Sequence, residues 1–331
     1  MALVIASGVL ANGLRTEFAD TYSKIKNRTA DGRLSAVMDL GIGATNREHQ
    51  FGFFEAAPHV ELWRRGETIP TDSFASRQFS TPVYTWGRRV PWHKDDRKDD
   101  QTGSLMTLAR MAGQSAALLP ERFFFDLLTG GTATLPAVPL APDGAAFFST
   151  TDGGGSARFG VTDGNLLTGS GLATSSAIRT DYYNLIEQWK QLQDGKGQPL
   201  LNDQVIDAGV LIVHPASATE AFEESFFQRR QGEVLGTDAG VTPSNLVQDA
   251  GRTVRLWGSS RLTGSDWYAF LLNSPTLPTF LLDREGVREY SSLEDDNNGD
   301  HTRNTGEEYV QWELRQGAGI ALPYGAMKVN N

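Results

Sequence analysis

The longest helical pattern in the chain lies between residues 101 and 131, and it constrains the fold more than any other stretch. Apolar side chains recur there at steps of three and four residues, the spacing that lines one face of an α-helix. They are Leu105, Leu108, Ala109, Ala112, Ala116, Leu119, Phe123 and Leu127. Pro120 removes one backbone donor and crowds the preceding turn, so we predict a kink or a break near Leu119.

Both ends of this helix carry end signals. Asp99, Asp100 and Thr102 crowd its first turn, where carboxylates meet the positive end of the helix dipole and a threonine can cap free amides. Gly130 and Gly131 follow its last turn. The preceding run V-Y-T-W-G-R-R-V-P-W reads as an extended arm rich in tryptophan and arginine. A long helix preceded by such an arm is more typical of a protein that contacts neighbouring copies of itself than of an enzyme that acts on a small molecule.

Length and composition exclude several classes of protein. With 331 residues, 39% of them hydrophobic, the chain can bury a sizeable core in two domains or one elaborated domain. No apolar run reaches the ~18 residues of a membrane span, and the first residues lack the basic start of a secretion signal. The absence of cysteine rules out disulfides and thiolate metal sites and fits a reducing cytoplasm. A net charge of −10 disfavours tight binding of nucleic acid over most of the surface.

The remaining pattern predicts an α+β fold. Residues 9 to 27 read as a first helix with Leu10, Leu14, Phe18, Tyr22 and Ile25 on one face, packed either in the core or on a neighbouring subunit. Residues 60 to 92 resemble a long two-stranded hairpin, which needs a partner surface because an isolated hairpin is marginal in water.

The second half of the chain alternates helices and strands. A helix is expected along the stripe from Ile178 to Leu192, and V-I-D-A-G-V-L-I-V is predicted as a buried strand. Pro215 is expected at the first position of the next helix. The runs T-V-R-L-W-G and W-Y-A-F-L-L are predicted to pair, before strands at T-F-L-L-D, V-R-E-Y and Y-V-Q-W-E-L-R.

The sequence predicts no catalytic, cofactor-binding or metal-binding residues. No phosphate loop, H-E-x-x-H or G-x-S-x-G motif occurs, and the five histidines are scattered singly. The acidic run from Asp95 to Asp100 is interleaved with lysine and arginine and reads as a solvated helix entrance. The run from Glu294 to Asp300 mimics a calcium loop, but the glutamate required at position twelve is Thr305, so a solvated loop is favoured.

Several stretches, taken together and in order, resemble the major capsid protein of tailed phages, specifically the Mu-like major head subunit family. The passage V-P-W-H-K-D-D-R-K-D-D-Q-T-G and the helix M-A-G-Q-S-A-A-L-L-P-E-R-F-F-F-D-L-L-T-G-G are similar to that family's junction of arm and spine helix. D-G-A-A-F-F-S at Asp143 is similar to its Asp-Gly-x-x-Phe-Phe-Ser element. The run from Asn165 through D-G-K-G-Q-P-L to G-V-L-I-V-H-P-A-S-A-T-E-A-F is similar to the next segment. The resemblance covers roughly residues 60 to 230 and departs at T-T-D-G-G-G, where a histidine is expected.

The resemblance implies the shell-forming fold of tailed phages. Residues 1–55 would form an N-terminal arm and residues 56–100 an extended loop. Residues 101–144 and 281–331 would form a peripheral domain built on the spine helix, and residues 145–280 an axial domain. Within the loop, tryptophan and arginine are the residue types enriched at the energetic centres of interfaces, although pairing inside the hairpin is their alternative role. The predicted inter-subunit contacts are Trp63, Arg64, Arg65, Trp86, Arg88, Arg89 and Trp92.

The implied function is assembly without catalysis. The chain would form pentamers and hexamers of an icosahedral head in the host cytoplasm, with scaffold and portal proteins, decoration proteins and weakly held double-stranded DNA as partners, and no membrane. An encapsulin-like compartment that encloses enzymes is one alternative, and a carboxylate hydrolase or calcium module at residues 294–300 is another. A covalent cross-link from Lys94 or Lys98 to Asn297, Asn298 or Asn304 is disfavoured against non-covalent locking.

Overall fold

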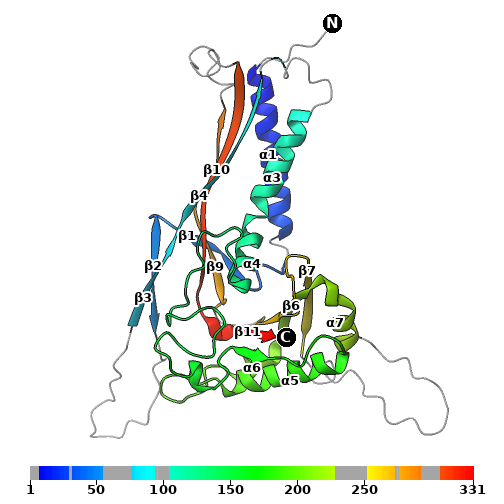
Figure 1. Ribbon diagram of the computed structural model, residues 1–331. Helices are drawn as coiled ribbons and strands as arrows, with labels where there is room; N and C mark the ends of the chain where they lie inside the picture. Colours follow the sequence, from blue (N-terminus) through cyan, green and yellow to red (C-terminus); the bar gives the residue numbers. More distant parts are fainter. Residues whose placement is uncertain are drawn as a thin grey trace, which may run out of the picture.

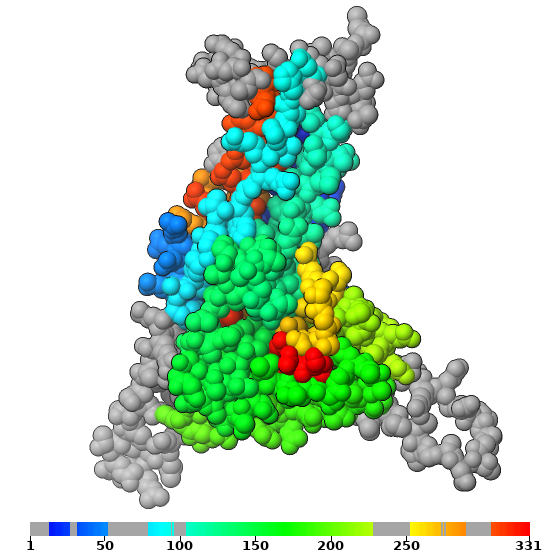
Figure 2. Space-filling model, viewed as in Figure 1, coloured from blue at the N-terminus to red at the C-terminus, as the bar shows by residue number. Residues whose placement is uncertain are grey.

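The computed structural model describes residues 7–29, 32–54, 76–93, 95, 104–227, 252–272, 274, 276–291 and 306–331. Two β-sheets and a separate hairpin organise this part of the chain, with helices packed beside both sheets. The molecule is elongated, because α1, α3 and the long strands rise together from a broader lower part (Figure 1). The space-filling view shows the same taper, with the chain between α4 and α7 making up much of the base (Figure 2).

A four-stranded sheet runs the length of the slender part. Its order is β1 (Met38–Gly43), β9 (Thr279–Ser291), β10 (Glu307–Ile320) and β4 (Tyr84–His93). Strand β10 is antiparallel to both neighbours, whereas β1 runs parallel to β9. The pairing sets Glu308 opposite Trp92 and Gln316 opposite Tyr84. The two stretches T-F-L-L-D and V-R-E-Y, expected as separate strands, form the single strand β9.

The long helical pattern forms two helices with a break where the proline predicts it. Helix α3 (Ser104–Ala117) ends before Leu118, and α4 (Leu119–Thr129) begins with Pro120 in its first turn. Gly130 adopts φ 68°, and its N–H donates to the Asp126 carbonyl. The predicted helix, its break and its glycine end are confirmed. The acidic residues expected in the first turn, Asp99 and Asp100, lie outside the described residues.

Helix α1 (Ser7–Thr29) confirms the predicted first helix and packs against α3 of its own chain. Leu14 and Phe18 are buried there, and the Phe18 ring stacks on Trp312 of β10 with centroids 5.0 Å apart. Outside this apolar seam, Arg110 makes a two-pronged ion pair with Glu17, at 2.7 and 3.1 Å. The core-packing alternative for this helix is therefore the one that the structure shows.

Replacing Gly113 by alanine should loosen this helix pair. A Cβ there would lie 2.8 Å from the Phe18 carbonyl oxygen and 3.3 Å from the Thr21 Cβ, so α1 must move. Overpacking costs about 1–3 kcal/mol, against a gain of about 1 kcal/mol from helix propensity. We expect Gly113→Ala to lower the free energy of unfolding in urea by about 1 kcal/mol net. Gly13→Ala is the control, because its Cβ meets only the flexible end of Met106 and should not destabilise.

The predicted hairpin is displaced along the chain. Strand β2 (Glu48–Phe54) pairs with β3 (Ser76–Pro82), with Phe51 opposite Phe79, and residues 55–75 between them lie outside the described residues. The prediction that residues 60 to 92 form the hairpin is wrong for β4, which pairs with β10 instead. The physical reason is that Trp92 of β4 is buried against the helices, a partner surface that a free hairpin lacks.

A five-stranded sheet forms the base. Its order is β5 (Leu166–Thr168), β11 (Ala326–Asn330), β8 (Trp267–Leu271), β6 (Val210–Pro215) and β7 (Val254–Ser259). The predicted pairing of T-V-R-L-W-G with W-Y-A-F-L-L is wrong, because β6 lies between them. Strand β11 also belongs to this sheet. The assignment of residues 281–331 to a peripheral domain, which the resemblance implies, stays a prediction.

Helices α5 (Ser175–Gln191), α6 (Asp203–Ala208) and α7 (Thr219–Phe226) belong to the base. The stripe predicted for α5 is confirmed, with Thr174 capping its start through a hydrogen bond from the Ala177 N–H. The V-I-D-A half of the predicted strand is helical instead, and the strand begins only after Gly209 at φ 150°. Pro215 ends β6, and α7 begins after a short 3₁₀ turn, so the proline precedes the helix by more than predicted.

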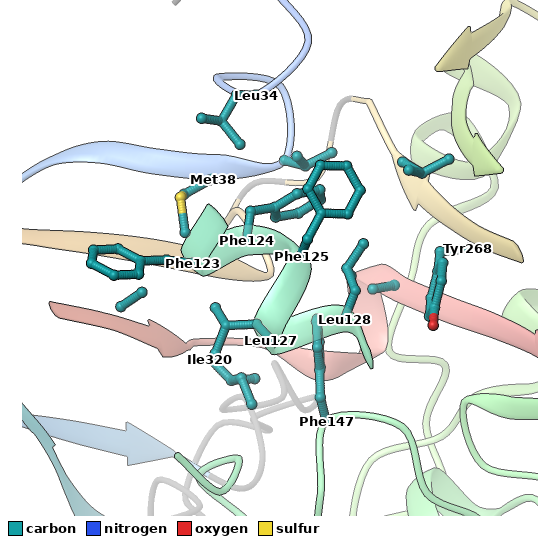
Figure 3. Close-up of a cluster of buried hydrophobic side chains, with 14 of the residues drawn as sticks. Leu34, Met38, Phe123, Phe124, Phe125, Leu127, Leu128, Phe147, Tyr268 and Ile320 are labelled. Carbon is teal, nitrogen blue, oxygen red and sulfur yellow. The ribbon is translucent and has the colours of Figure 1, made fainter. Parts of the chain in front are cut away.

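Helix α4 joins the two sheets through an aromatic cluster. Its buried Phe123, Phe124 and Phe125 lie among side chains from both sheets (Figure 3). The Phe124 ring stacks on Trp257 with centroids 5.5 Å apart, and it contacts Phe270 at 5.6 Å. One large hydrophobic cluster thus sits where the long sheet meets the base, and a second lies within the base between its sheet and helices.

Candidate assembly surface

The described contact candidates all lie on β4, at one edge of the four-stranded sheet. Register and burial set Trp86, Arg88 and Trp92 on one side of the strand and Arg89 on the other. Trp63, Arg64 and Arg65 lie outside the described residues. An edge strand is the natural place for a contact between copies, because one of its sides has no neighbour in its own sheet.

The two tryptophans make their contacts inside the chain. Trp92 is buried in the cluster of α1 and α3, and its indole N–H donates to Glu308 Oε2 at 3.0 Å. Trp86 packs on Phe123 with centroids 5.1 Å apart, and its N–H donates to the Gln316 carbonyl at 2.9 Å. Both rings therefore make these contacts within the chain, with β10 and the helices rather than inside the hairpin that the alternative role named. A role for them between subunits stays a prediction.

Both arginines of β4 are exposed, as are Thr85, Gly87, Pro91 and His93. Arg89 donates from Nε to Gln311 Oε1 at 3.0 Å, and its guanidinium lies 4.2 Å from the Tyr309 ring centroid. Arg88 is exposed on the other side of the strand, in register with Trp312. Pro91 has no N–H to offer to an added strand. Charge and proline on an edge both discourage strand addition, so this edge favours contacts through side chains.

A buried arginine that sequence reasoning missed organises the long connection after α4. Arg158 is 1% exposed, and its guanidinium pairs with the Asp143 carboxylate through Nε at 2.7 Å and Nη2 at 3.0 Å. Its Nη1 donates to the carbonyls of Ala146 and Phe147 at 3.0 and 2.7 Å. Burial lowers the pKa of Arg158, and the pairing with Asp143 opposes that shift. The signal that could have found this pair is the D-G-A-A-F-F-S element that contains Asp143.

Asn165 ties this network to the end of the chain. Its buried amide oxygen accepts from Arg158 Nη1 at 2.8 Å and from the Ser149 N–H at 3.0 Å. Its Nδ2 donates to the carbonyls of Phe147, Pro323 and Ala326 at 2.9 to 3.3 Å. Each polar atom that the network buries therefore has a partner, and the connection is fixed to the turn before β11.

One hollow and the distribution of acidic and histidine side chains bear on ligand binding in the described residues. A polar hollow of about 320 Å³ lies beside α5, lined by Asp163, Leu167, Thr168, Asn184, Glu187, Gln188 and Gln191. No group of three histidine or acidic side chains in the described ranges could hold a metal ion. The calcium-like run at residues 294–300, the cross-link candidates Lys94 and Lys98, and their asparagine acceptors lie outside those ranges. Among the helices that the structure describes, none is long and apolar enough to cross a membrane.

Comparison with known proteins identifies the fold and the family. A family model described as phage capsid protein matches residues 78–329, and no curated protein matches. The capsid of the cyanophage P-SCSP1u is similar over 89% of this chain and 86% of its own, with a TM-score of 0.54 at 10% identity. The capsid of an empty GTA particle (90% and 95%, TM-score 0.53, 7% identity) and that of Microbacterium phage Oxtober96 (90% and 90%, TM-score 0.52, 13% identity) are also similar. The predicted tailed-phage capsid fold is confirmed, and the Mu-like subfamily stays a prediction.

Proposed function

Because the chain belongs to the phage capsid protein family, we propose that it assembles into pentamers and hexamers of an icosahedral head around double-stranded DNA. The observation that carries the proposal is the family match over residues 78–329, joined to a fold shared with capsid structures over about nine tenths of the chain. The chain is a structural protein of a virion capsid. Assembly in the host cytoplasm and contacts with scaffold, portal and decoration proteins belong to the proposal.

The shape of the molecule supports heterologous contacts. Pentamers, hexamers and closed shells need contacts between two different surfaces of the subunit, repeated around an axis. The slender part, with the β4 edge and the β2–β3 hairpin, supplies one projecting surface, and the broad base supplies another (Figure 1). Under this proposal the base lies toward the axis of each capsomer, and the hairpin reaches the neighbouring subunit.

The charge of the chain fits a container that holds DNA weakly. A net charge of −10 makes the average surface repel phosphates, so the genome can slide during packing and release. An assembled shell should therefore bind duplex DNA weakly at physiological salt. Tight, salt-sensitive binding of duplex DNA by such shells would contradict this part of the proposal.

Sedimentation velocity of the purified full chain over a range of concentrations tests assembly. The proposal predicts species of five and six times the 36.1 kDa subunit mass, and larger bodies as concentration rises. A single species of subunit mass at every concentration would argue against it. Particles that carry a protein cargo instead of DNA in the producing cell would favour the encapsulin-like alternative. Monomer-sized bands in denaturing electrophoresis of the particles would exclude the covalent cross-link.

Reversing the charge of both exposed arginines on β4 should weaken assembly without unfolding the subunit. Arginine is enriched among interface residues whose loss costs more than 1 kcal/mol, so Arg88→Glu with Arg89→Glu should raise the assembly concentration by about tenfold or more. The melting temperature of the subunit should fall by only a few degrees, since the Arg89 contacts are exposed ones. The control is Arg33→Glu with Lys190→Glu, an equal change of charge on other exposed side chains. If the β4 variant and the control variant assemble at the same concentration, β4 does not contribute to the interface between subunits.

A further inference from the structure

His214 is buried between the five-stranded sheet and α7. It is the second-last residue of β6 and is 0% exposed. Its imidazole stacks on the Phe222 ring of α7, with centroids 4.4 Å apart and planes 9° from parallel. In register with it on β7 stands Gly258, where an added Cβ would come within 3.0 Å of His214 Cε1. The ring therefore lies in close contact with both the helix and the edge strand, at the end of the base where Figure 1 shows α7 beside β6 and β7.

The hydrogen bonds of the ring fix which nitrogen carries the proton. Nδ1 lies 2.9 Å from the Pro215 carbonyl oxygen, and a carbonyl can only accept, so Nδ1 bears the hydrogen. Nε2 is buried and has no hydrogen-bond partner among the described residues. In the neutral ring, the Nδ1 hydrogen bond is made and only the Nε2 acceptor is left without a partner. A charged ring would add a second N–H that finds no acceptor there.

The surroundings of the ring carry little charge. The positions of β7 and β8 on this side of the sheet are apolar or glycine: Val254, Leu256, Gly258, Trp267, Ala269 and Leu271. On α7, the Glu223 carboxylate acts on the imidazole, and Glu220 and Glu224 are exposed on the same helix. Burial lowers the pKa of His214 more strongly than the Pro215 hydrogen bond and Glu223 raise it.

We propose that His214 is an acid-sensitive latch that holds α7 on the five-stranded sheet. When Nε2 takes up a proton, the new charged N–H lies between the Phe222 ring and β7, and α7 moves away until water reaches it. The helix is short, with eight residues. Phe222 and Phe226 bury its inner face, and Ser225 Oγ donates to the Ser175 carbonyl of α5 at 3.2 Å. Its release uncovers both aromatic side chains. This inference follows from the fold and does not depend on what the shell encloses.

The sign of the pH dependence follows from the lowered pKa. Above about pH 6.5, the usual value for histidine, the ring is neutral in both the closed and the open state and the latch holds fully. Below it the open state binds a proton first, so the closed state loses stability as pH falls toward the lowered pKa. Over that window the population of the open state should rise by about tenfold per pH unit.

Amide hydrogen exchange of the full-length chain measures this opening. After correction for the intrinsic pH dependence of exchange, protection of residues 219–227 should fall by about tenfold per pH unit between pH 6.5 and 5. Protection of α3, which does not pack on α7, should stay constant over the same range, which separates release of α7 from general acid unfolding. Constant protection of α7, or an equal loss in α3, would overturn the proposal.

Substitution of the histidine tests the cause. His214→Phe keeps the stacking on Phe222, and His214→Gln keeps an amide donor, but neither side chain titrates. Both variants should show protection of α7 that does not change between pH 7 and pH 5, whereas His49→Gln should keep the wild-type loss. If both variants lack α7 protection at pH 7, the comparison of α7 with α3 in the wild-type chain decides. If a variant whose α7 is fully protected at pH 7 still loses that protection at pH 5, a group other than His214 is responsible for the pH dependence.

Discussion

Arg158→Ala is expected to lower the free energy of unfolding by about 3 kcal/mol, the lower end of the range for breaking a buried ion pair. The substitution leaves the Asp143 carboxylate and the carbonyls of Ala146 and Phe147 without their donor. Each orphaned polar group costs about 1–3 kcal/mol when it stays buried. The lower figure applies because Asp143 keeps some contact with water, its side chain being 18% exposed.

Urea unfolding of the subunit measures this cost, with two variants as controls. Arg158→Lys should recover part of the loss, because a single ammonium can meet the carboxylate but cannot reach the carbonyls in the same fork geometry. Arg179→Ala removes an arginine of α5 whose Nε donates only weakly, at 3.4 Å, to the Ser175 carbonyl, and should cost less than about 0.5 kcal/mol. A loss of under about 1 kcal/mol for Arg158→Ala would show that the network does not hold the connection.

Phe124→Ala is expected to cost about 3–5 kcal/mol, because it opens a cavity where α4 joins the two sheets. The ring is fully buried and packs on Phe125, Trp257 and Phe270. Its neighbours come from α4 itself and from two different strands of the base. The cavity therefore cannot close unless α4 moves relative to the base. The loss should therefore also reduce the cooperativity between the slender part and the base.

The matched control for this variant is Phe227→Ala. Phe227 follows α7 and is 44% exposed, so the same change of side chain there should cost less than about 1 kcal/mol. Thermal unfolding followed by near-ultraviolet and far-ultraviolet circular dichroism compares the two. A similar small loss at both positions would contradict the role of the aromatic cluster as the joint of the molecule.

Local patterns in the sequence predicted the long helices well, whereas the short helix α6 was predicted as part of a strand. The apolar stripe and Pro120 placed α3, α4 and the break between them, since both signals act within a few residues of the chain. The same reasoning found α1 and α5. The Pro215 prediction was less accurate, because an extended residue at the end of a strand and a first helical residue both suit the fixed φ of proline.

Pairing of strands could not be predicted in the same way. Trp92 and Glu308 are 216 residues apart in the chain, so nothing local indicated that β4 would pair with β10. The insertion of β6 between β7 and β8 is a consequence of the crossover through α7, which sequence proximity concealed. At the candidate site, Arg158 was not singled out from the sequence, because a charged side chain in a glycine-rich loop is usually solvated. Only the fold brings Asp143, Asn165 and the final turn around it.

In the proposed assembly, the β2–β3 hairpin and the β4 edge contact adjacent copies of the chain. Electron microscopy of particles formed from the concentrated full-length protein tests these contacts. We expect rings, sheets or closed shells in which the hairpin of one subunit lies over the next and Arg88 or Arg89 touches that neighbour. Particles in which the hairpin touches no neighbouring subunit, with β4 facing solvent, would contradict this expectation.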